Sequence, residues 1–445
     1  MNESTTRRTI LKNATAALAA APLLGTLASR SYAAGDDTIK LALIGCGGRG
    51  LGAGDDALST THPIKIVAMA DAFSGQIEFA LNRLRDKYGS KVDVPTERQF
   101  AGLDAYKKAI DAGVDGVILA TPPGFRPMQF EYAVQQGKHV FMEKPVATDA
   151  PGVRRVLEAN KIAKQRNLKV GVGLQRHHKP VYLEGIERIK NGDIGQIVYM
   201  RCYWHGTPVW IRTRQQLAEK LQRTPTEMEY QVNNWYYFNW LSGDHIVEQH
   251  IHNIDVCNWI MGKHPVKAQG VGGRQTRSDE EGQIYDHHAV EFIYDDETRM
   301  ISFCRQSVGC YNTQSEFAHG TKGNADVSGG RIEAGGSKWL YKPERGAPPV
   351  NEYVNEHQNL WAAVLKNQPF NEADYGAEST MTAILGRMAS YTGKVVGYDD
   401  ALSKGAAMVP PDAQLAWDAT PPVVPGPGGR YPQPMPGQYD LSKLG

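Results

Sequence analysis

The chain has few cysteines, no excess of one charge sign, and no hydrophobic run long enough to cross a membrane. Its five cysteines form no CxxC pair in 445 residues, which excludes a disulfide-stapled scaffold and favours buried free thiols. Lys plus Arg (49) nearly balances Asp plus Glu (48), so nothing electrostatic favours a nucleic-acid partner. With 41% hydrophobic and 22% charged residues, the chain is globular and long enough for about two or three domains.

The first 33 residues have the order of an export signal. Arg7 and Arg8 precede an Ala- and Leu-rich stretch, 14–28, and Ser31-Tyr32-Ala33 resembles a small-residue cleavage site. This order is typical of a secretory leader, and the paired arginines indicate the twin-arginine pathway. The alternative is a chance arginine pair before an amphipathic helix. We expect residues 1–33 to be removed and the mature protein to be soluble and periplasmic.

A glycine-rich turn follows the first predicted strand. Residues 38–44 are apolar and precede Gly45-Cys46-Gly47-Gly48-Arg49-Gly50, and a second strand, 64–70, ends at Asp71. Such a turn lets the main chain approach a pyrophosphate, and an acid about 20 residues further on accepts hydrogen bonds from ribose. Asp71 would repel a 2′-phosphate and so favours NAD, although Arg49 keeps NADP open. A tight turn with a solvated aspartate is the alternative.

Strands and helices then alternate along the chain. The pattern predicts helices at 103–112, 127–136 and 151–167 and strands at 114–120, 139–142 and 169–174. This alternation predicts a doubly wound parallel sheet over residues 36–176. Ligands bind at the carboxyl ends of such strands, so the residues expected to face the dinucleotide are Thr121, Pro122, Glu143, Lys144 and Gln175.

These motifs resemble the Gfo/Idh/MocA family of glucose–fructose oxidoreductase, inositol dehydrogenase and rhizopine-catabolism proteins. The resemblance lies in the glycine turn, Asp71, Thr121-Pro122-Pro123 and above all Glu143-Lys144-Pro145. It implies an N-terminal Rossmann domain that binds a nicotinamide dinucleotide. It also implies a C-terminal α/β domain whose large, mostly antiparallel sheet covers the nicotinamide and often forms the oligomer interface, here of a homo-oligomer.

The rest of the chain divides into a second domain and a tail. Alternating residues predict strands at 197–204, 289–294, 300–306 and 313–317, which suit an antiparallel sheet within a domain at 177–408. Residues 409–445 are rich in Pro and Gly and are expected to lie along the surface, because such a segment builds no core.

A helix predicted over 241–255 carries the candidate catalytic groups. His245, Glu248 and His252 fall at helical spacings of three and four, so their side chains are expected to converge. In the resembling family a D-x-x-x-H segment on this helix supplies the catalytic histidine, and Glu248 and His252 occupy those places. We expect His252 to act as base, Lys144 to polarise the reacting oxygen and Glu248 to orient the imidazole. The alternatives are a buried polar network and a zinc site, and we expect no metal.

Aromatic residues crowd the segment before this helix. Sugar faces stack on aromatic rings, which makes Trp210, Trp235 and Tyr236 candidate substrate contacts, although such clusters also form cores and subunit contacts. Arg176 and His245 are further candidates for substrate hydroxyls, and Arg176 is equally compatible with a solvated helix start. Arg126 allows a phosphate or carboxylate partner.

Export restricts the choice of function, because free nicotinamide cofactor is cytoplasmic. An exported enzyme must carry a tightly bound cofactor and restore it within each cycle. We expect an oxidoreductase that oxidises one sugar CH–OH group and reduces a second sugar. The alternatives are an NAD-dependent glycosidase or lyase that oxidises its substrate transiently, and a sugar-binding protein that retains the fold without catalysis.

Overall fold

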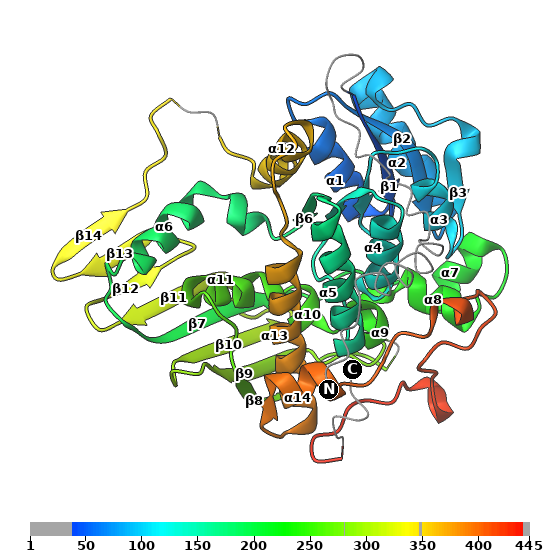
Figure 1. The fold of residues 1–445 in the computed structure, drawn as a ribbon. Helices are drawn as coiled ribbons and strands as arrows, with labels where there is room; N and C mark the ends of the chain where they lie inside the picture. The colour runs from blue at the N-terminus through cyan, green and yellow to red at the C-terminus, as the bar shows by residue number, and fades with distance from the viewer. Residues whose placement is uncertain (1–37, 280, 347–348, 439–445) are drawn as a thin grey trace, which may run out of the picture.

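The computed structural model describes residues 38–279, 281–346 and 349–438, so the predicted leader lies outside the described residues. One sheet has six parallel strands in the order β3-β2-β1-β4-β5-β6, and a second has nine strands in the order β14-β13-β12-β11-β7-β10-β9-β8-β15 (Figure 1). The first order is that of a dinucleotide-binding Rossmann sheet. The predicted α/β class, with a parallel sheet followed by a mostly antiparallel one, is confirmed.

The first sheet and its helices occupy the N-terminal part of the chain. The strands are β1 (Ile39–Ile44), β2 (Ile64–Asp71), β3 (Gln99–Ala101), β4 (Gly116–Leu119), β5 (His139–Met142) and β6 (Val170–Val172). The helices are α1 (Gly48–Leu58), α2 (Ser74–Tyr88), α3 (Ala105–Ile110), α4 (Arg126–Gln135) and α5 (Ala150–Gln165). The sequence pattern did not predict β3 or α2.

Strand β1 shows why this sheet is buried on both faces. Ile39, Leu41 and Leu43 pack into one apolar cluster, whereas Ala42 and Ile44 pack into the cluster on the opposite face. A strand covered by helices on both sides is apolar at consecutive positions rather than alternate ones. The unbroken apolar run at 38–44 is therefore the signature of a central parallel strand.

Helix α12 (Glu352–Leu365) returns from the second half of the chain to cover the first sheet. Leu360, Trp361 and Val364 belong to the same apolar cluster as the inward side chains of β1, and α12 contacts α1. Sequence order assigns this helix to the second domain at 177–408, but its packing places it on the first sheet.

The second domain contains the nine-stranded sheet. Its strands are β7 (Ile197–Gly206), β8 (Lys267–Gly273), β9 (His287–Ile293), β10 (Arg299–Gln306), β11 (Thr313–Gly320), β12 (Gly323–Asp326), β13 (Arg331–Ala334), β14 (Ser337–Leu340) and β15 (Val396–Gly397). The helices are α6 (Pro180–Lys190), α7 (Arg214–Leu221), α8 (Glu227–Asn233), α9 (Asn239–Ser242), α10 (His245–Glu248), α11 (Ile251–Met261), α13 (Ala373–Thr392) and α14 (Tyr398–Lys404). Strands β7 and β10 pair in parallel, and the other pairs are antiparallel.

The two faces of this sheet differ in burial. Met200 and Met300, from the paired strands β7 and β10, are fully buried. On the opposite face Tyr203 and Phe303 stack with ring centroids 5.7 Å apart and remain partly exposed. Alternation of this kind is expected for a sheet with helices on one face only.

The C-terminal tail lies against both domains. Asp412 pairs with Arg155 of α5 through two hydrogen bonds of 2.8 and 2.9 Å. Trp417 lies 5.2 Å from the ring of Phe73, and Tyr431 lies 5.0 Å from that of Phe238. Figure 1 shows the tail, in red, beside α7 and α8. It therefore connects the Rossmann domain to the segment before α9.

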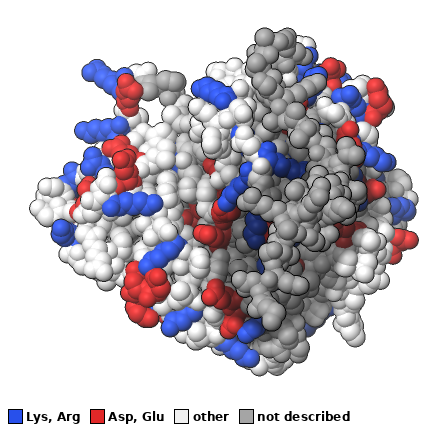
Figure 2. Space-filling model, viewed as in Figure 1, with Lys and Arg blue, Asp and Glu red and all other residues white. Residues whose placement is uncertain are grey.

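The helices and the surface charges can be compared with the prediction that neither a membrane nor a nucleic acid is a partner. No helix in the described part of the chain is both long and apolar enough to span a bilayer. The face drawn in Figure 2 carries Lys and Arg interspersed with Asp and Glu. That neither nucleic acid nor membrane is a partner stays a prediction.

Candidate active site

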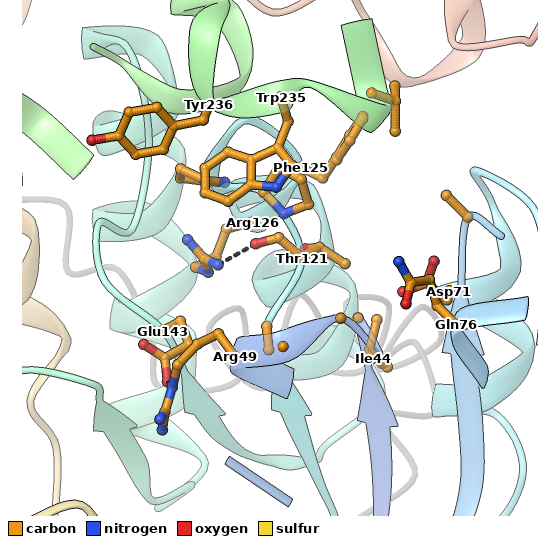
Figure 3. Close-up of a pocket in the computed structure, with 18 of the residues that line it drawn as sticks. Ile44, Arg49, Asp71, Gln76, Thr121, Phe125, Arg126, Glu143, Trp235 and Tyr236 are labelled. Carbon is orange, nitrogen blue, oxygen red and sulfur yellow. Dashed lines mark hydrogen bonds and ion pairs between the residues drawn. The ribbon is translucent and has the colours of Figure 1, made fainter. Parts of the chain in front are cut away.

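A cavity of about 650 Å³ lies between the carboxyl ends of the first sheet and the second domain. The first domain contributes Gly45, Asp71 and Lys144 to its wall, and the second contributes Trp235 and His252. Figure 3 shows the labelled part of this wall, with the aromatic rings on one side and the strand ends on the other. The cavity occupies the place where open parallel sheets bind their ligands.

The glycine turn after β1 is shaped to receive a dinucleotide. Gly45 has a φ of +90°, and a Cβ there would lie 2.5 Å from the nitrogen of Thr121; a Cβ on Gly50 would lie 1.7 Å from the Gly45 oxygen. By contrast, a Cβ on Gly47 or Gly48 meets nothing within 4 Å, and both residues line the cavity. Two glycines thus allow close packing, and two leave space at the start of α1 for a pyrophosphate. A dinucleotide fits these residues.

Asp71 stands at the end of β2 with its carboxylate held in place. It accepts hydrogen bonds from the main-chain nitrogens of Cys46 (2.7 Å) and Phe73 (2.9 Å). Burial raises the pKa of Asp71, and these two hydrogen bonds oppose that rise. Cys46 contributes only through its main chain, because its side chain is buried away from the cavity. The carboxylate keeps lone pairs for ribose hydroxyls.

The guanidinium of Arg49 is surrounded by carboxylates. It pairs with Glu143 at 2.5 Å and Asp56 at 3.2 Å and lies 4.0 Å from Glu356. Burial by itself lowers the pKa of Arg49, but these carboxylates raise it above its ordinary value. Figure 3 shows Arg49 beside Glu143, with Asp71 on the other side of the glycine turn. Since its charge is already neutralised, Arg49 does not favour a 2′-phosphate, and NAD is the better fit.

The other residues expected to face the dinucleotide are distributed around it. Thr121, Pro122, Glu143 and Gln175 all line the cavity. Gln175 donates from Nε2 to the Tyr353 hydroxyl at 3.0 Å, and its Oε1 is buried without a partner among the described residues. That oxygen is a free acceptor at the cavity wall. Gly50, like Cys46, does not line the cavity and acts through packing.

Lys144 joins the two domains at the reactive end of the cavity. Its Nζ donates to the main-chain oxygen of Glu248 at 2.5 Å and to the Glu248 carboxylate at 2.9 Å. The expected contact between Glu248 and His252 is therefore wrong. The ammonium is the stronger partner for a carboxylate in this largely buried site.

His252 lies on the cavity wall without a carboxylate partner. Trp204 stacks on the imidazole, with ring centroids 5.8 Å apart and planes 20° apart, so an aromatic ring rather than Glu248 orients it. Nδ1 is buried with no hydrogen-bond partner within the described chain. Burial, followed by the charges of Lys144, Arg176 and Arg49, places the pKa of His252 well below 6.5. The imidazole is therefore neutral near pH 7, as a general base must be.

The predicted helix over 241–255 is broken, and His245 is lost from the site. Helix α10 ends at Glu248 and α11 begins at Ile251, so the three side chains do not share one stripe. His245 is fully buried outside the cavity and pairs with Asp244 at 2.8 Å. It is not a substrate contact, and it does not meet Glu248 and His252 as a zinc site requires.

Asp244, His245 and His288 instead form a buried cluster whose ligand atoms lie within 4.8 Å of one another. Asp244 already accepts hydrogen bonds from the Tyr391 hydroxyl and the Tyr285 nitrogen. Burial raises the pKa of Asp244, but His288 and His245 lower it well below its ordinary value. The cluster ties α10 to β9 and α13 through Asp244, while Nε2 of His245 is buried without a hydrogen-bond partner among the described residues.

Arg176 also proves to be structural, whereas the aromatic candidates do line the cavity. Arg176 pairs with the buried Glu316 of β11 and is absent from the cavity wall. The short turn at Gln175–His178 directs successive side chains to different sides. Trp210, Trp235 and Tyr236 form an edge-packed group with ring centroids between 5.7 and 6.1 Å. Trp210 remains 45% exposed.

Several residues of the cavity wall were not predicted from the sequence. Tyr353 comes from the start of α12, and Phe73, Tyr106 and Arg212 come from loops and helices around the far end of the cavity. None belongs to a recognisable motif, because each meets the cavity only through tertiary packing. The motifs identified the glycine turn, Asp71 and the reactive end, but not these additional wall residues.

Two family models match this chain. The model described as an oxidoreductase family with an NAD-binding Rossmann fold matches residues 39–174, and the GFO/IDH/MocA C-terminal domain matches residues 182–326. The chain is similar to scyllo-inositol 2-dehydrogenase (NAD(+)) of Bacillus subtilis, with 24% identity over 53% of this chain and 57% of the relative. It is also similar to inositol 2-dehydrogenase of Rhizobium meliloti, with 25% identity over 64% of this chain and 74% of the relative.

Solved structures share the fold. Scyllo-inositol dehydrogenase of Lactobacillus casei with bound NAD(H) and scyllo-inositol has a TM-score of 0.59 at 21% identity, over 81% of this chain and 99% of that one. Aldose-aldose oxidoreductase of Caulobacter crescentus has a TM-score of 0.63 at 18% identity, with the same coverage. These similarities support the two-domain architecture described above.

Changing Asp71→Asn should weaken NAD binding about tenfold, because a hydrogen bond to a charged acceptor is lost. NADP binding should weaken less, since the carboxylate that repels its 2′-phosphate is gone. Calorimetric titration of nucleotide-depleted protein with each cofactor measures both effects. Asp93→Asn, at an exposed aspartate, is the control; an unchanged preference between NAD and NADP in Asp71→Asn would contradict the assignment.

Proposed function

The chain belongs to the Gfo/Idh/MocA family, and on that premise we propose that it is an NAD-dependent oxidoreductase acting on a sugar-like CH–OH group. One observation carries this proposal: Lys144 and His252, from different domains, line the same cavity as the glycine turn. The curated relatives are inositol dehydrogenases, which supports a polyhydroxylated ring as the substrate. Their alignments cover 57% and 74% of the relatives' length.

The residues of the cavity divide the chemistry between them. NAD supplies the hydride acceptor. Lys144 uses two of its N–H groups on Glu248, which leaves a third to donate to the reacting oxygen and stabilise negative charge there. His252 is neutral and takes the hydroxyl proton. One carbinol would thus become a carbonyl: bound NAD would take the hydride, His252 takes the hydroxyl proton, and Lys144 stabilises the charge on the oxygen.

The cofactor is held within the protein throughout the cycle. Residues 207–238, here called the roof segment, contribute Val209, Arg212 and Asn233 to the cavity wall opposite the Rossmann domain. The tail fastens this segment: the main-chain oxygens of Trp417 and Val423 accept hydrogen bonds from the side chains of Thr226 (2.7 Å) and Gln231 (2.6 Å). An enclosed dinucleotide dissociates slowly, because the enclosing contacts must open first.

A cofactor that stays bound suits an enzyme located outside the cytoplasm. The leader-like residues 1–33 support export to the periplasm, where no pool of free cofactor restores the oxidised form. The cycle then closes when a second sugar carbonyl accepts the hydride and a proton and becomes a carbinol. The partly exposed rings of Tyr203 and Phe303 support a homo-oligomer formed through the open face of the second sheet.

Protein purified without added cofactor should release NAD on denaturation. Before denaturation, adding a polyol should produce the absorbance of reduced nicotinamide, and a sugar carbonyl should then remove it. Chromatography of the released nucleotide and spectrophotometry of the intact protein measure the two properties. Cleavage of glycosides without paired oxidation and reduction would replace this proposal with the glycosidase alternative. An inability to bind NAD would indicate a sugar-binding protein.

Lys144→Met and His252→Ala should each lower kcat by about 100-fold or more while NAD stays bound, because the first removes the donor to the reacting oxygen and the second removes the base. A base works in its neutral form, so activity falls as pH drops through the pKa of His252. Because that pKa lies well below 6.5, kcat/KM of the unaltered enzyme should hold down to below pH 6.5. Steady-state kinetics across pH, with NAD content measured in parallel, provide the data.

Lys179→Met is a matched control, since it removes a lysine ion pair with Glu352 (2.8 Å) that lies outside the cavity. Its kcat should stay close to that of the unaltered enzyme. Full activity in Lys144→Met would overturn the catalytic assignment.

Trp417→Ala should speed NAD release by about tenfold, because the ring no longer packs on Phe73 at the cavity wall. Capture of the released cofactor by a second dehydrogenase measures the rate. Val424→Ala, in an exposed part of the same tail, should leave the rate unchanged. Equal release from both variants would show that the tail does not retain the cofactor.

A further inference from the structure

The wall of the cavity contains one buried cation that no described carboxylate neutralises. Arg126, the first residue of α4, is 2% exposed and lines the cavity. Figure 3 shows it between the aromatic pair Trp235 and Tyr236 and the pair Arg49 and Glu143. It therefore lies between the candidate sugar platform and the dinucleotide turn.

The guanidinium of Arg126 bonds only to main-chain oxygens. Nη1 donates to the oxygen of Pro145 at 2.5 Å, and Nη2 donates to that of Thr121. Nε is buried with no hydrogen-bond partner in the described chain. Pro145 directly follows Lys144, so these contacts hold the positive charge beside the reactive amine. They leave the charge itself without a counter-ion.

The other cations of the wall are compensated. Arg49 pairs with Glu143, and Lys144 pairs with Glu248. Arg212 forms no ion pair within residues 38–279, 281–346 and 349–438, but it is partly exposed, so water stabilises its charge. Arg126 is almost fully buried and forms no ion pair with a described carboxylate, and a buried charge without a counter-ion is unfavourable.

Arg126 nevertheless remains charged at neutral pH. Burial lowers the pKa of its guanidinium to about 10, while Glu143 and Glu248 act in the opposite direction. Both carboxylates are already engaged with other cations. An anion that enters the cavity therefore finds a cation with spare N–H groups and an unmet charge.

We propose that Arg126 binds the carboxylate of the substrate, so that the enzyme oxidises a sugar acid in preference to a neutral sugar. This inference rests on the oxidoreductase function proposed above. A carboxylate matches the planar, forked guanidinium, and its single negative charge would neutralise the single positive charge of Arg126. A phosphate ester carries up to two charges and would need a second free cation here.

The carboxylate itself undergoes no bond change. It fixes the sugar acid while a neighbouring carbinol faces Lys144 and His252, gives its hydride to NAD and gives its hydroxyl proton to His252.

The alternative is that Arg126 only braces the Thr121 and Lys144-Pro145 turns against each other. A brace would affect every substrate alike, whereas a carboxylate ligand affects acids selectively. The decisive quantity is therefore the ratio of kcat/KM for an acid to that for the neutral sugar of the same ring.

The experiment uses the full enzyme with NAD bound and follows the reduction of the nicotinamide. The probes are glucose with glucuronate, galactose with galacturonate, glucose 6-phosphate, and myo-inositol. In the unaltered enzyme the best acid should exceed its neutral counterpart by about 100-fold in kcat/KM. Arg126→Met should remove this preference, lowering the rate on the acid by about 100-fold and that on the neutral sugar by less than about fivefold. Arg126→Lys, which keeps the charge but not the fork, should retain part of it.

Arg387→Met controls for the loss of a buried arginine. Arg387 is fully buried outside the cavity and, like Arg126, donates to main-chain oxygens, those of Thr148 and Gly243. Thermal melting and NAD content should show any cost to the fold in both variants, but the acid preference should survive in Arg387→Met.

The outcomes separate the two proposals. Oxidation of neutral sugars without preference for acids, a preference for the phosphate ester, or equal losses on acid and neutral substrates in Arg126→Met would each overturn the carboxylate site and leave the oxidoreductase function intact. No nicotinamide reduction with any probe would contradict the oxidoreductase function itself, and the carboxylate site would fall with it.

Discussion

The ion pair between Lys144 and Glu248 is the interaction on which the arrangement of the site depends. Lys144 follows the end of β5 in the Rossmann domain, and Glu248 ends α10 in the second domain. Both side chains are mostly buried, at 13% and 14% exposure. Removing either partner of such a pair leaves a buried charge alone, at a cost of about 3–5 kcal/mol. The same contact fixes the break after α10, and α11 carries His252 from that break onto the cavity wall.

The net charge around the reacting groups depends on which cation each carboxylate of the cavity pairs with. Glu143 neutralises Arg49 and Glu248 neutralises Lys144, so neither is free to act as a base or to hold an imidazole. Asp71 keeps a carboxylate braced by main-chain donors at the cofactor end. His252, surrounded by cations and buried, is kept neutral. Positive charge thus gathers around the reacting oxygen, and the remaining base is an uncharged imidazole.

The roof segment and the tail enclose the cavity on the side opposite the Rossmann domain. The roof segment contains the short helices α7 and α8, whereas the tail after α14 has only short 3-10 turns, and both carry side chains that fasten them. Tyr431, near the end of the described tail, packs on Phe238, and its hydroxyl donates to Glu227 of α8 at 2.5 Å. Because the tail also pairs with Arg155 of α5, it ties the roof segment to the Rossmann domain around the cavity.

The sequence by itself determined the Rossmann domain, the glycine turn, Asp71 and the strand-end residues through Lys144 and Gln175. These features are local: an apolar strand, a turn that requires glycine at Gly45 and Gly50, and a side chain at a strand end follow from short-range sterics and burial. Periodicity also identified helices α3, α4 and α5 and the central strands of the second sheet, β11, β7, β10 and β9. It did not find β3, which has only three residues, or the return of α12 to the first sheet.

Only the tertiary structure decided what each charged side chain does. A helical pattern placed His245, Glu248 and His252 together, but the chain breaks between α10 and α11, and His245 pairs in the core with Asp244. Arg176 met Glu316, and Glu248 met Lys144, across sequence separations that no local pattern encodes. Opposite charges pair by distance in space, and that distance exists only once both sheets and their helices have packed.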